Sequence, residues 1–307
     1  MHEQPLVSII TPSFNQAQFL EQTITSVLDQ DYPSIEYLVV DGNSSDGSQA
    51  IIKKYAGRIT WWVSEPDHGQ AAAINKGLKH AKGEIVAWLN SDDYYLPGAV
   101  TKAVAAFTNH PSFSLVYGDV LAVDADGFQI NKLHYHQMDL IDLMRFNIIG
   151  QPSVFIRRDT LNKIGFLDPS YQYLLDHQLW LRLAQQAPIQ YLPEMLSAAR
   201  FHSQSKNVAQ AGAFGEEAYR IIAWMQGIPE LKSKYENNKN RIWAGAHRFN
   251  ARYLLDGEQP WAAYQAYSQC LRADFPTALQ EWYRIIYSLA AAAGLVKLKS
   301  LHPRWRK

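Results

Sequence analysis

The stretch LVSIITPSFNQAQFLEQTITSVL, residues 6–28, decides the fold class. It begins with the apolar run Leu6–Ile10, and apolar side chains then recur every three or four residues, as on one face of a helix. Similar apolar runs return until about Gly118 and are typical of strands buried on both faces of a parallel sheet. The later runs are 37–40, 61–63, 85–89 and 115–117.

The amphipathic segments between these runs predict crossover helices. We expect helices from Asp46 or Gly47 to Tyr55, from Gln70 to Ala81, and from Pro97, a residue that suits the first helical position. The alternation predicts an α/β fold, with an open, mostly parallel sheet, flanking helices and a ligand crevice at the carboxyl ends of the strands.

Beyond Gly212 the pattern changes to helices alone, after a mixed stretch of about 119–207. We therefore expect an α/β domain at 1–211 and an all-helical C-terminal region at 212–307. The expected helices are 214–225, 231–255, 260–271 and 276–295.

Composition excludes several classes of protein. The 29 Lys and Arg balance 29 Asp and Glu, so the chain lacks the basic surface that nucleic-acid binding usually requires. A hydrophobic fraction of 47% rules out a disordered or fibrous chain. Cys270 is the single cysteine, and the residues after Met1 do not resemble a signal peptide, so we expect a cytoplasmic protein.

The C-terminal end supports two interpretations. The apolar stretch 285–296 is too short to span a bilayer, and basic residues without any acid follow it. A last core helix with a solvated end is the simpler interpretation. A short helix with a basic tail lying on the inner face of a membrane is the other. The basic residues are Lys297, Lys299, Arg304, Arg306 and Lys307.

Polar residues collect directly after three of the predicted strands, in the loops Thr11–Asn15, Asp41–Gly47 and Asn90–Asp93. The carboxyl ends of parallel strands meet at one edge of a sheet, so we expect the three loops to form one site. Each of the first two loops, taken alone, is also explained by turn and capping chemistry.

The loop Asn90–Asp93 points to a metal. Its adjacent carboxylates, Asp92 and Asp93, repel each other unless a cation or a basic partner lies nearby, and oxygen ligands suit Mg²⁺ or Mn²⁺. The first strand is not followed by a glycine-rich phosphate loop, which argues against dinucleotide oxidoreductases and P-loop NTPases. A diphosphate ligand would then need a metal to neutralise it.

Several motifs in order resemble glycosyltransferase family 2, which comprises inverting, nucleotide-sugar-dependent enzymes of GT-A fold. The resemblance covers roughly residues 5–205 and leaves the helical tail out. The motifs are Val7–Asn15, Asp41–Ser48, Gly83–Ile85, Trp88–Asp93, Gln151–Phe155 and Asp176–Leu183.

The resemblance implies a donor site for a nucleoside diphosphate such as UDP. Pro12, Ser13 and Asn15 would border the nucleotide, and Asp41 would bind the base. Asn90 and Ser91 would also contact the nucleotide part of the donor.

The resemblance also implies the catalytic residues. Asp92 would be the direct ligand of Mn²⁺ or Mg²⁺, and His202 a further metal or diphosphate contact. Asp176 would be the catalytic base that takes the proton of the acceptor hydroxyl. Taken alone, Asp176 is also explained as the N-cap of an amphipathic helix. Aromatic side chains could floor an acceptor pocket, although core packing is their default; they are Tyr94, Tyr95, His134, Tyr135 and His136.

This sequence departs from the family pattern at the donor site and beside the base. Asn90 stands where the metal motif usually begins with an aspartate, and Ile74 where an arginine is common. Leu175 replaces the first of an acidic pair, and Gln178 replaces another acid.

The function implied is a metal-dependent, inverting glycosyltransferase of polysaccharide biosynthesis that moves a sugar from a nucleotide-sugar donor to a glycan or lipid-linked acceptor. Two alternatives stay open. A nucleotidyltransferase would be expected to carry a glycine-rich, basic segment after the first strand, and Thr11–Asn15 has neither feature. A non-catalytic module that binds nucleotide sugars or glycans would explain Asn90 as decay of the site.

Overall fold

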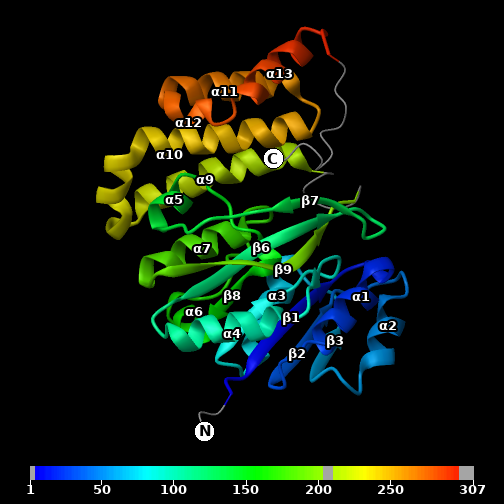
Figure 1. Ribbon diagram of the computed structural model, residues 1–307. Helices are drawn as coiled ribbons and strands as arrows, with labels where there is room; N and C mark the ends of the chain where they lie inside the picture. The colour runs from blue at the N-terminus through cyan, green and yellow to red at the C-terminus, as the bar shows by residue number, and fades with distance from the viewer. Residues whose placement is uncertain (1–3, 203–209, 297–307) are drawn as a thin grey trace. The chain divides into compact units, whose positions relative to one another are not determined.

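The computed structural model describes residues 4–202 and 210–296 and divides the chain into two compact units (Figure 1). The first unit comprises residues 1–138 and 149–200, and the second comprises 139–148 and 201–307. These units differ from the predicted ranges 1–211 and 212–307 in two ways. The division falls between Arg200 and Phe201, and the segment Asp139–Ile148 belongs to the helical unit.

The first unit is built on one nine-stranded sheet in the order β3-β2-β1-β4-β8-β6-β9-β5, with β7 paired to β6. The strands β1 to β4, β6 and β9 run in one direction, and β5, β7 and β8 run antiparallel to them. The predicted α/β fold with a mostly parallel sheet is confirmed. The strands are β1 Val7–Ser13, β2 Ile35–Asp41, β3 Trp61–Ser64, β4 Ile85–Trp88, β5 Tyr94–Tyr95, β6 Leu115–Val123, β7 Gln129–Leu133, β8 Phe155–Arg157 and β9 Ile189–Arg200.

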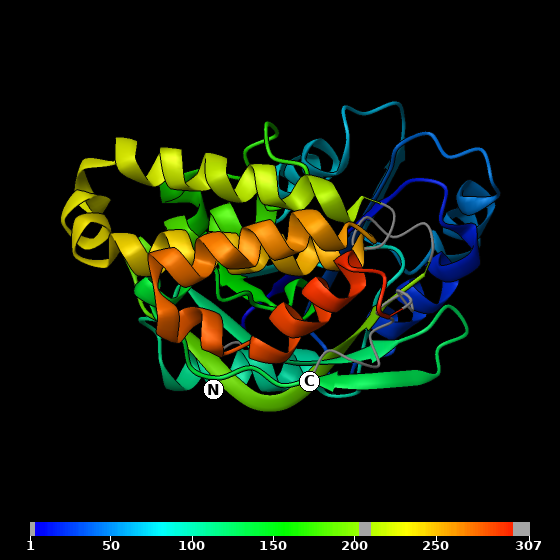
Figure 2. The same cartoon turned by 90° about the horizontal axis from the view of Figure 1, so that it is seen from above.

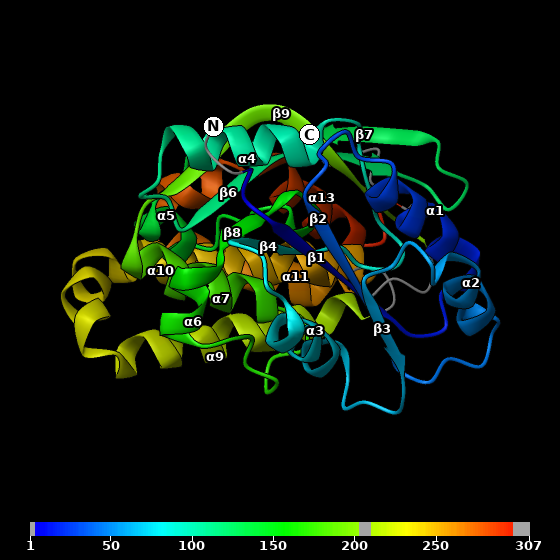
Figure 3. The same ribbon diagram turned by 90° about the horizontal axis from the view of Figure 1, so that it is seen from below.

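Helices cover both faces of this sheet, with α1 and α4 on one face and α3, α6 and α7 on the other (Figure 3). Ile9 and Val39 face α1 and α4 in a core from which water is excluded. On the other face, α3 approaches β1 closely at Gly77, where a Cβ would lie 2.5 Å from a methyl carbon of Ile10. The helices are α1 Ala17–Leu28, α2 Ser48–Tyr55, α3 Gln70–His80, α4 Ala99–Asn109, η1 Gln151–Ser153, α6 Arg158–Ile164 and α7 Leu175–Gln186.

The second unit is helical, as predicted for the C-terminal region. Its helices α9, α10 and α11 run side by side (Figure 2). Among residues 4–202 and 210–296, the structure has no helix with the length and apolar character needed to cross a bilayer. The elements are α5 Leu140–Met144, η2 Ala211–Ala213, α9 Phe214–Gly227, α10 Pro229–Asp256, α11 Pro260–Ala273, α12 Phe275–Leu279 and α13 Trp282–Ala292.

Several boundaries differ from the sequence prediction, and three of them have a local structural cause. The first strand continues to Ser13, because parallel pairing with β2 runs on to Asp41. The helix expected from Pro97 begins at Ala99, since Gly98 precedes it with a left-handed φ of 78°. The long last helix is broken into α12 and α13, and Glu281 stands at the break as the N-cap residue of α13.

Candidate active site

Hydrogen bonds join the loops that follow β1 and β2. The backbone N–H of Asn15 donates to Ser44 Oγ at 2.8 Å, and the N–H of Ser45 donates back to Asn15 Oδ1 at 2.9 Å. Asn15 has a φ of 51°, a left-handed conformation that asparagine adopts more readily than most residues. Asn15 therefore holds the two loops together.

Asp41 lies at the end of β2 with no exposed surface. Its carboxylate accepts hydrogen bonds from the Ser44 N–H at 3.0 Å, from Ser44 Oγ at 2.6 Å and from Ser64 Oγ at 2.6 Å. An ionised carboxylate has about four acceptor positions, so these three donors occupy most of its capacity. A bound base would reach Asp41 only after Ser44 or Ser64 moved, and the predicted role in base binding stays a prediction.

Ser13 offers a polar group that the fold does not use. Its side chain is 3% exposed at the end of β1, and its Oγ has no hydrogen-bond partner among the described residues. A buried hydroxyl without a partner costs free energy on the order of 1–3 kcal/mol. A ligand group or a water at this edge of the sheet would remove that cost.

The amide of Asn90 is the centre of a side-chain network. Its Oδ1 accepts from Gln70 Nε2 at 2.8 Å, and its Nδ2 donates to Gln151 Oε1 at 3.1 Å and to Asp93 Oδ2 at 3.3 Å. Gln151 Nε2 in turn donates to the carbonyl of Trp88 at 2.8 Å. An ionised aspartate at position 90 could donate neither of the Nδ2 bonds, which explains why asparagine suits this network.

The two adjacent acids of this loop have different environments. Asp93 is 6% exposed and accepts a hydrogen bond from the backbone N–H of Arg200 at 3.0 Å. Burial, and then the charge of Asp92, raise the pKa of Asp93 well above its usual range. Asp92 is half-buried. The metal-binding potential of the loop therefore rests on Asp92.

Arg200 is the basic partner of the Asp92–Asp93 loop, which the sequence alone did not identify. Its Nε donates to the carbonyl of Asp92 at 3.0 Å, and its guanidinium lies over the rings of Phe19 and Tyr94. The hydroxyl of Thr23 on α1 also donates to the carbonyls of Ser91 and Asp93, at 3.0 and 2.6 Å. These bonds hold the backbone of the loop, and the charge of Arg200 offsets part of the repulsion at Asp93, so the adjacency of the two acids alone does not require a metal.

Asp176 is the second residue of α7. The N-cap interpretation is wrong, because Leu174 stands at the N-cap and makes no side-chain cap bond. Asp176 Oδ1 instead accepts from the N–H of His177 at 2.7 Å, in the first turn, where the helix dipole favours a negative charge.

A stacked tryptophan pair ties α7 to the end of β4. The rings of Trp88 and Trp180 lie 5.2 Å apart, with 23° between their planes. Asp92 follows Trp88 by four residues, and Asp176 precedes Trp180 by one helical turn. The stacked pair thus packs α7, which carries Asp176, against the strand that the Asp92 loop follows.

Residues 4–202 and 210–296 contain no group of three or more His, Cys, Asp or Glu placed to hold a metal. His202 is half-buried and belongs to the second unit, so its predicted metal contact stays a prediction. A single half-buried carboxylate suits a divalent ion that arrives with a diphosphate, since Mg²⁺ is commonly held by one or two carboxylates plus substrate phosphates.

The aromatic residues expected near an acceptor have mixed roles. Tyr95 is buried and stacks on Phe155 at 5.5 Å, so it belongs to the core. His134 is exposed, and its Nδ1 lies 2.6 Å from Asp119 Oδ2. The same carboxylate accepts from the N–H of Tyr135 at 2.9 Å.

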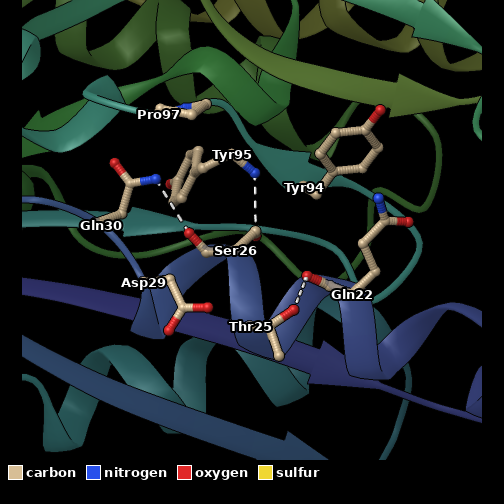
Figure 4. A pocket seen from close by; sticks show the side chains of 8 residues that line it. All are labelled: Gln22, Thr25, Ser26, Asp29, Gln30, Tyr94, Tyr95 and Pro97. Atoms are coloured by element: carbon tan, nitrogen blue, oxygen red, sulfur yellow. Dashed lines mark hydrogen bonds between the residues drawn. The ribbon is translucent and has the colours of Figure 1, made fainter.

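A pocket of about 190 Å³ opens between α1 and the β5 region (Figure 4). None of the predicted donor, metal or catalytic residues lines it, but Tyr94 and Tyr95, two of the aromatic residues considered for an acceptor pocket, do. Its lining residues are Gln22, Thr25, Ser26, Asp29, Gln30, Tyr94, Tyr95 and Pro97.

Sequence reasoning missed the side chains that hold the site together. Gln70 and Gln151 orient Asn90, Ser64 binds Asp41, and Arg200 secures the loop after β4. Ser64 ends β3, so the rule that polar residues gather where strands end could have found it. Arg200 gave no such signal, because it lies 108 residues from the Asp92 carbonyl that it binds.

Comparison with known proteins identifies the family. Residues 8–165, just over half of the chain, match the family described as Glycosyl transferase family 2. The chain belongs to glycosyl transferase family 2. The relatives of this family 2 chain include the Bacillus subtilis glycosyltransferase TuaG, named for teichuronic acid biosynthesis, which is 32% identical over 66% of this chain and 81% of TuaG.

An uncharacterized glycosyltransferase of Rickettsia felis is 30% identical over 74% of this chain. The family 2 chain spans only 39% of the length of that relative.

Two solved structures share the fold. S. aureus TarS in complex with UDP-GlcNAc superposes with a TM-score of 0.61 at 17% identity, over 94% of this chain and 92% of that one. The mannosyltransferase PcManGT of Pyrobaculum calidifontis, in complex with GDP-Man and Mn²⁺, gives 0.62 at 18% identity, over 96% and 82%. At these identities the similarity establishes the fold alone, and it confirms the expected GT-A architecture.

Proposed function

We propose that this family 2 chain is an inverting glycosyltransferase that moves a sugar from a nucleoside-diphosphate donor to a hydroxyl of a glycan or lipid-linked glycan. One observation carries the proposal. The loops after β1 and β2 are hydrogen-bonded at one edge of the sheet, and the tryptophan pair ties α7, with Asp176, to the end of β4, from which the Asp92 loop follows. The donors bound by TarS and PcManGT, UDP-GlcNAc and GDP-Man, support a nucleotide-sugar donor.

The donor nucleoside would lie along the ends of β1 and β2. The unpartnered hydroxyl of Ser13 can donate to or accept from the donor, and Pro12 beside it has no N–H to satisfy. Asn15 and Asp41 shape the adjoining loop. Asn90 and Ser91 would orient the diphosphate end through the loop that their own bonds make rigid.

Asp92, together with the donor's diphosphate, would hold Mn²⁺ or Mg²⁺. When bound, such an ion offsets the negative charge that develops on the departing diphosphate. Asp93 keeps the loop in place through the backbone of Arg200.

Asp176 would take the proton from the acceptor hydroxyl. The hydroxyl oxygen forms its bond to the anomeric carbon as the bond from that carbon to the diphosphate oxygen breaks, so configuration inverts in one displacement. Placement in the first turn of α7 stabilises the ionised carboxylate that a general base requires.

The test combines donor binding with turnover. A thermal-shift panel of UDP, GDP, dTDP and CMP with Mn²⁺ identifies the nucleotide, because a ligand bound only by the folded state raises its stability. With that donor, Asp176→Asn should lower transfer about 1000-fold and leave nucleotide affinity unchanged.

Asp159→Asn is the matched control, because Asp159 is also the second residue of its helix, α6, and is exposed. It should retain full activity. Nucleotide binding without turnover of any donor, in the wild type as in Asp176→Asn, would instead establish a non-catalytic binding module.

A further inference from the structure

Helix α13 exposes one apolar face and buries two polar side chains, while Ile285 packs inward against the core of the second unit. Trp282, Ile286 and Leu289 are 58%, 58% and 45% exposed, and their spacing of four and three residues puts them on one face. Arg284 and Ser288 are 5% and 0% exposed. This arrangement is the reverse of an ordinary surface helix, whose apolar stripe faces the core.

Buried charges explain why α13 keeps this orientation. The guanidinium of Arg284 lies 3.7 Å from Asp256 Oδ1. At the start of the helix, the buried Glu281 accepts hydrogen bonds from Arg252 and, at 2.8 Å, from the hydroxyl of Tyr267. Turning the helix to hide its apolar face would separate Arg284 from these groups. The exposed apolar face is therefore built into the second unit.

Exposed apolar side chains also lie on α12 and directly after α13. We call this surface the α12–α13 face. Monomeric proteins rarely expose contiguous apolar surface of more than a few hundred Å², so such a face marks a binding surface. Its members are Phe275, Leu279, Trp282, Tyr283, Ile286, Leu289, Leu295 and Val296.

The charge of the adjoining sequence indicates what binds there. From Trp282 to Lys307 the chain has no Asp or Glu, although the whole chain is neutral. A bilayer with anionic lipids satisfies both features, because it takes up the apolar side chains and attracts the basic ones. A second copy of this chain would bring like charges together. Arg284 is buried beside Asp256, so the basic residues left to face an anionic surface are those outside the described residues: Lys297, Lys299, Arg304, Arg306 and Lys307.

Helix length and side-chain type agree with a helix that lies along the membrane surface. The eleven residues of α13 extend about 16 Å, roughly half of the ~30 Å apolar core of a bilayer. Trp282 and Tyr283 carry amphipathic rings of the kind enriched at membrane interfaces.

We propose that the α12–α13 face docks the protein peripherally on an anionic lipid surface. The docking concerns where the protein resides and does not depend on the sugar transferred.

Flotation of the full chain with vesicles tests the proposal. The chain should bind phosphatidylcholine vesicles containing about one third phosphatidylglycerol, and should bind pure phosphatidylcholine more weakly. The combined variant Trp282→Ser, Ile286→Ser, Leu289→Ser should lower the partition coefficient at least about tenfold. Raising the salt concentration should weaken binding of the wild type.

Phe128→Ser is the matched control, because Phe128 is 72% exposed and lies in the first unit. This variant should bind vesicles as the wild type does. A second variant, Lys297→Glu with Lys299→Glu, leaves the apolar side chains unchanged and so tests the contribution of the basic residues to binding without the serine substitutions. It should lower binding to anionic vesicles only. Equal partitioning of the wild type and the triple variant would overturn the proposal. A dimer in sedimentation that the triple variant abolishes, without vesicle binding, would assign the face to a second copy.

Discussion

The two units of this protein distribute polar and apolar side chains in opposite ways. In the first unit, apolar strands fill the interior, and polar groups such as Ser13 and Asp92 gather where the strands end. In the second unit, Arg284 and Glu281 lie inside while Trp282 and Ile286 face outward. Each unit thus departs from the ordinary pattern of burial at a surface that we propose to be functional. In the first unit this surface is a polar edge that binds a diphosphate, and in the second it is an apolar face that binds lipid.

The buried acids of the two units sharpen the contrast. Burial raises the pKa of Asp93, and its neighbour Asp92 adds to the effect. Burial alone would also raise the pKa of Glu281, but Arg252 and then the other arginines around it lower that pKa below its ordinary value. The sign of the neighbouring charges therefore decides whether the pKa of a buried carboxyl is raised or lowered.

The largest effect on stability is expected from Glu281→Gln. The substitution removes the buried carboxylate that pairs with Arg252 and that lowers the net positive charge around Arg248, so the free energy of unfolding should fall by about 3 kcal/mol, measured by urea denaturation. Glu258→Gln, at an exposed position, is the control and should change little. A variant as stable as the wild type would show that the buried cluster contributes no net stability.

The same group predicts a pH dependence. The folded-state pKa of Glu281 lies below its ordinary value of 4.5, so its contribution to stability is present above that pH and is lost as the pH falls through the folded-state pKa. The wild type should therefore lose more stability on acidification than Glu281→Gln does. Parallel curves for the two proteins would contradict this assignment.

The next effect concerns the two acids after β4. Asp92→Asn should lower transfer about 100-fold and raise the Mn²⁺ concentration needed for half-maximal activity. Asp93→Asn is the adjacent control: it should alter the melting temperature through its contact with Arg200 but leave the metal requirement unchanged. Equal metal dependence of Asp92→Asn and the wild type would remove the assigned role of Asp92.

A smaller effect distinguishes base binding from loop shaping at Asp41. Asp41→Ala should weaken nucleotide binding about tenfold in calorimetry, on the order of 1.4 kcal/mol. Ser64→Ala releases one acceptor position of the Asp41 carboxylate, so it should leave the affinity unchanged or improve it. If Ser64→Ala weakens binding as much as Asp41→Ala does, Asp41 acts only by shaping the loop.

The smallest effect is expected at His247 in the second unit. Burial lowers the pKa of this histidine below 6.5 in the folded state, so the unfolded chain binds more protons and stability falls as the pH drops through 6.5. His247→Gln should therefore flatten the stability curve between about pH 5 and pH 8. An unchanged slope, measured by thermal melts in matched buffers, would show that His247 titrates alike in both states.

The local sequence pattern predicted much of the secondary structure of the first unit. The apolar runs predicted β1 to β4 because a strand buried on both faces needs continuous apolar side chains. The same reasoning left the strands from β7 to β9 unrecognised, and the alternating and polar residues of Gln129–Leu133 and Ile189–Arg200 show why. The second of these is half exposed over several residues and does not stand out as a buried strand.

The amino-acid sequence by itself determined the α/β class, the family and the three polar loops, because these depend on residue order and on spacing along the chain. Only the tertiary structure decided that Asp93 is buried while Asp92 is half-buried. It also decided that Gln70 and Gln151 bind the amide of Asn90, and that the apolar face of α13 is exposed. These outcomes depend on partners distant in the sequence. Burial and hydrogen bonding are set by which groups meet in space, and neither can be read from neighbours along the chain.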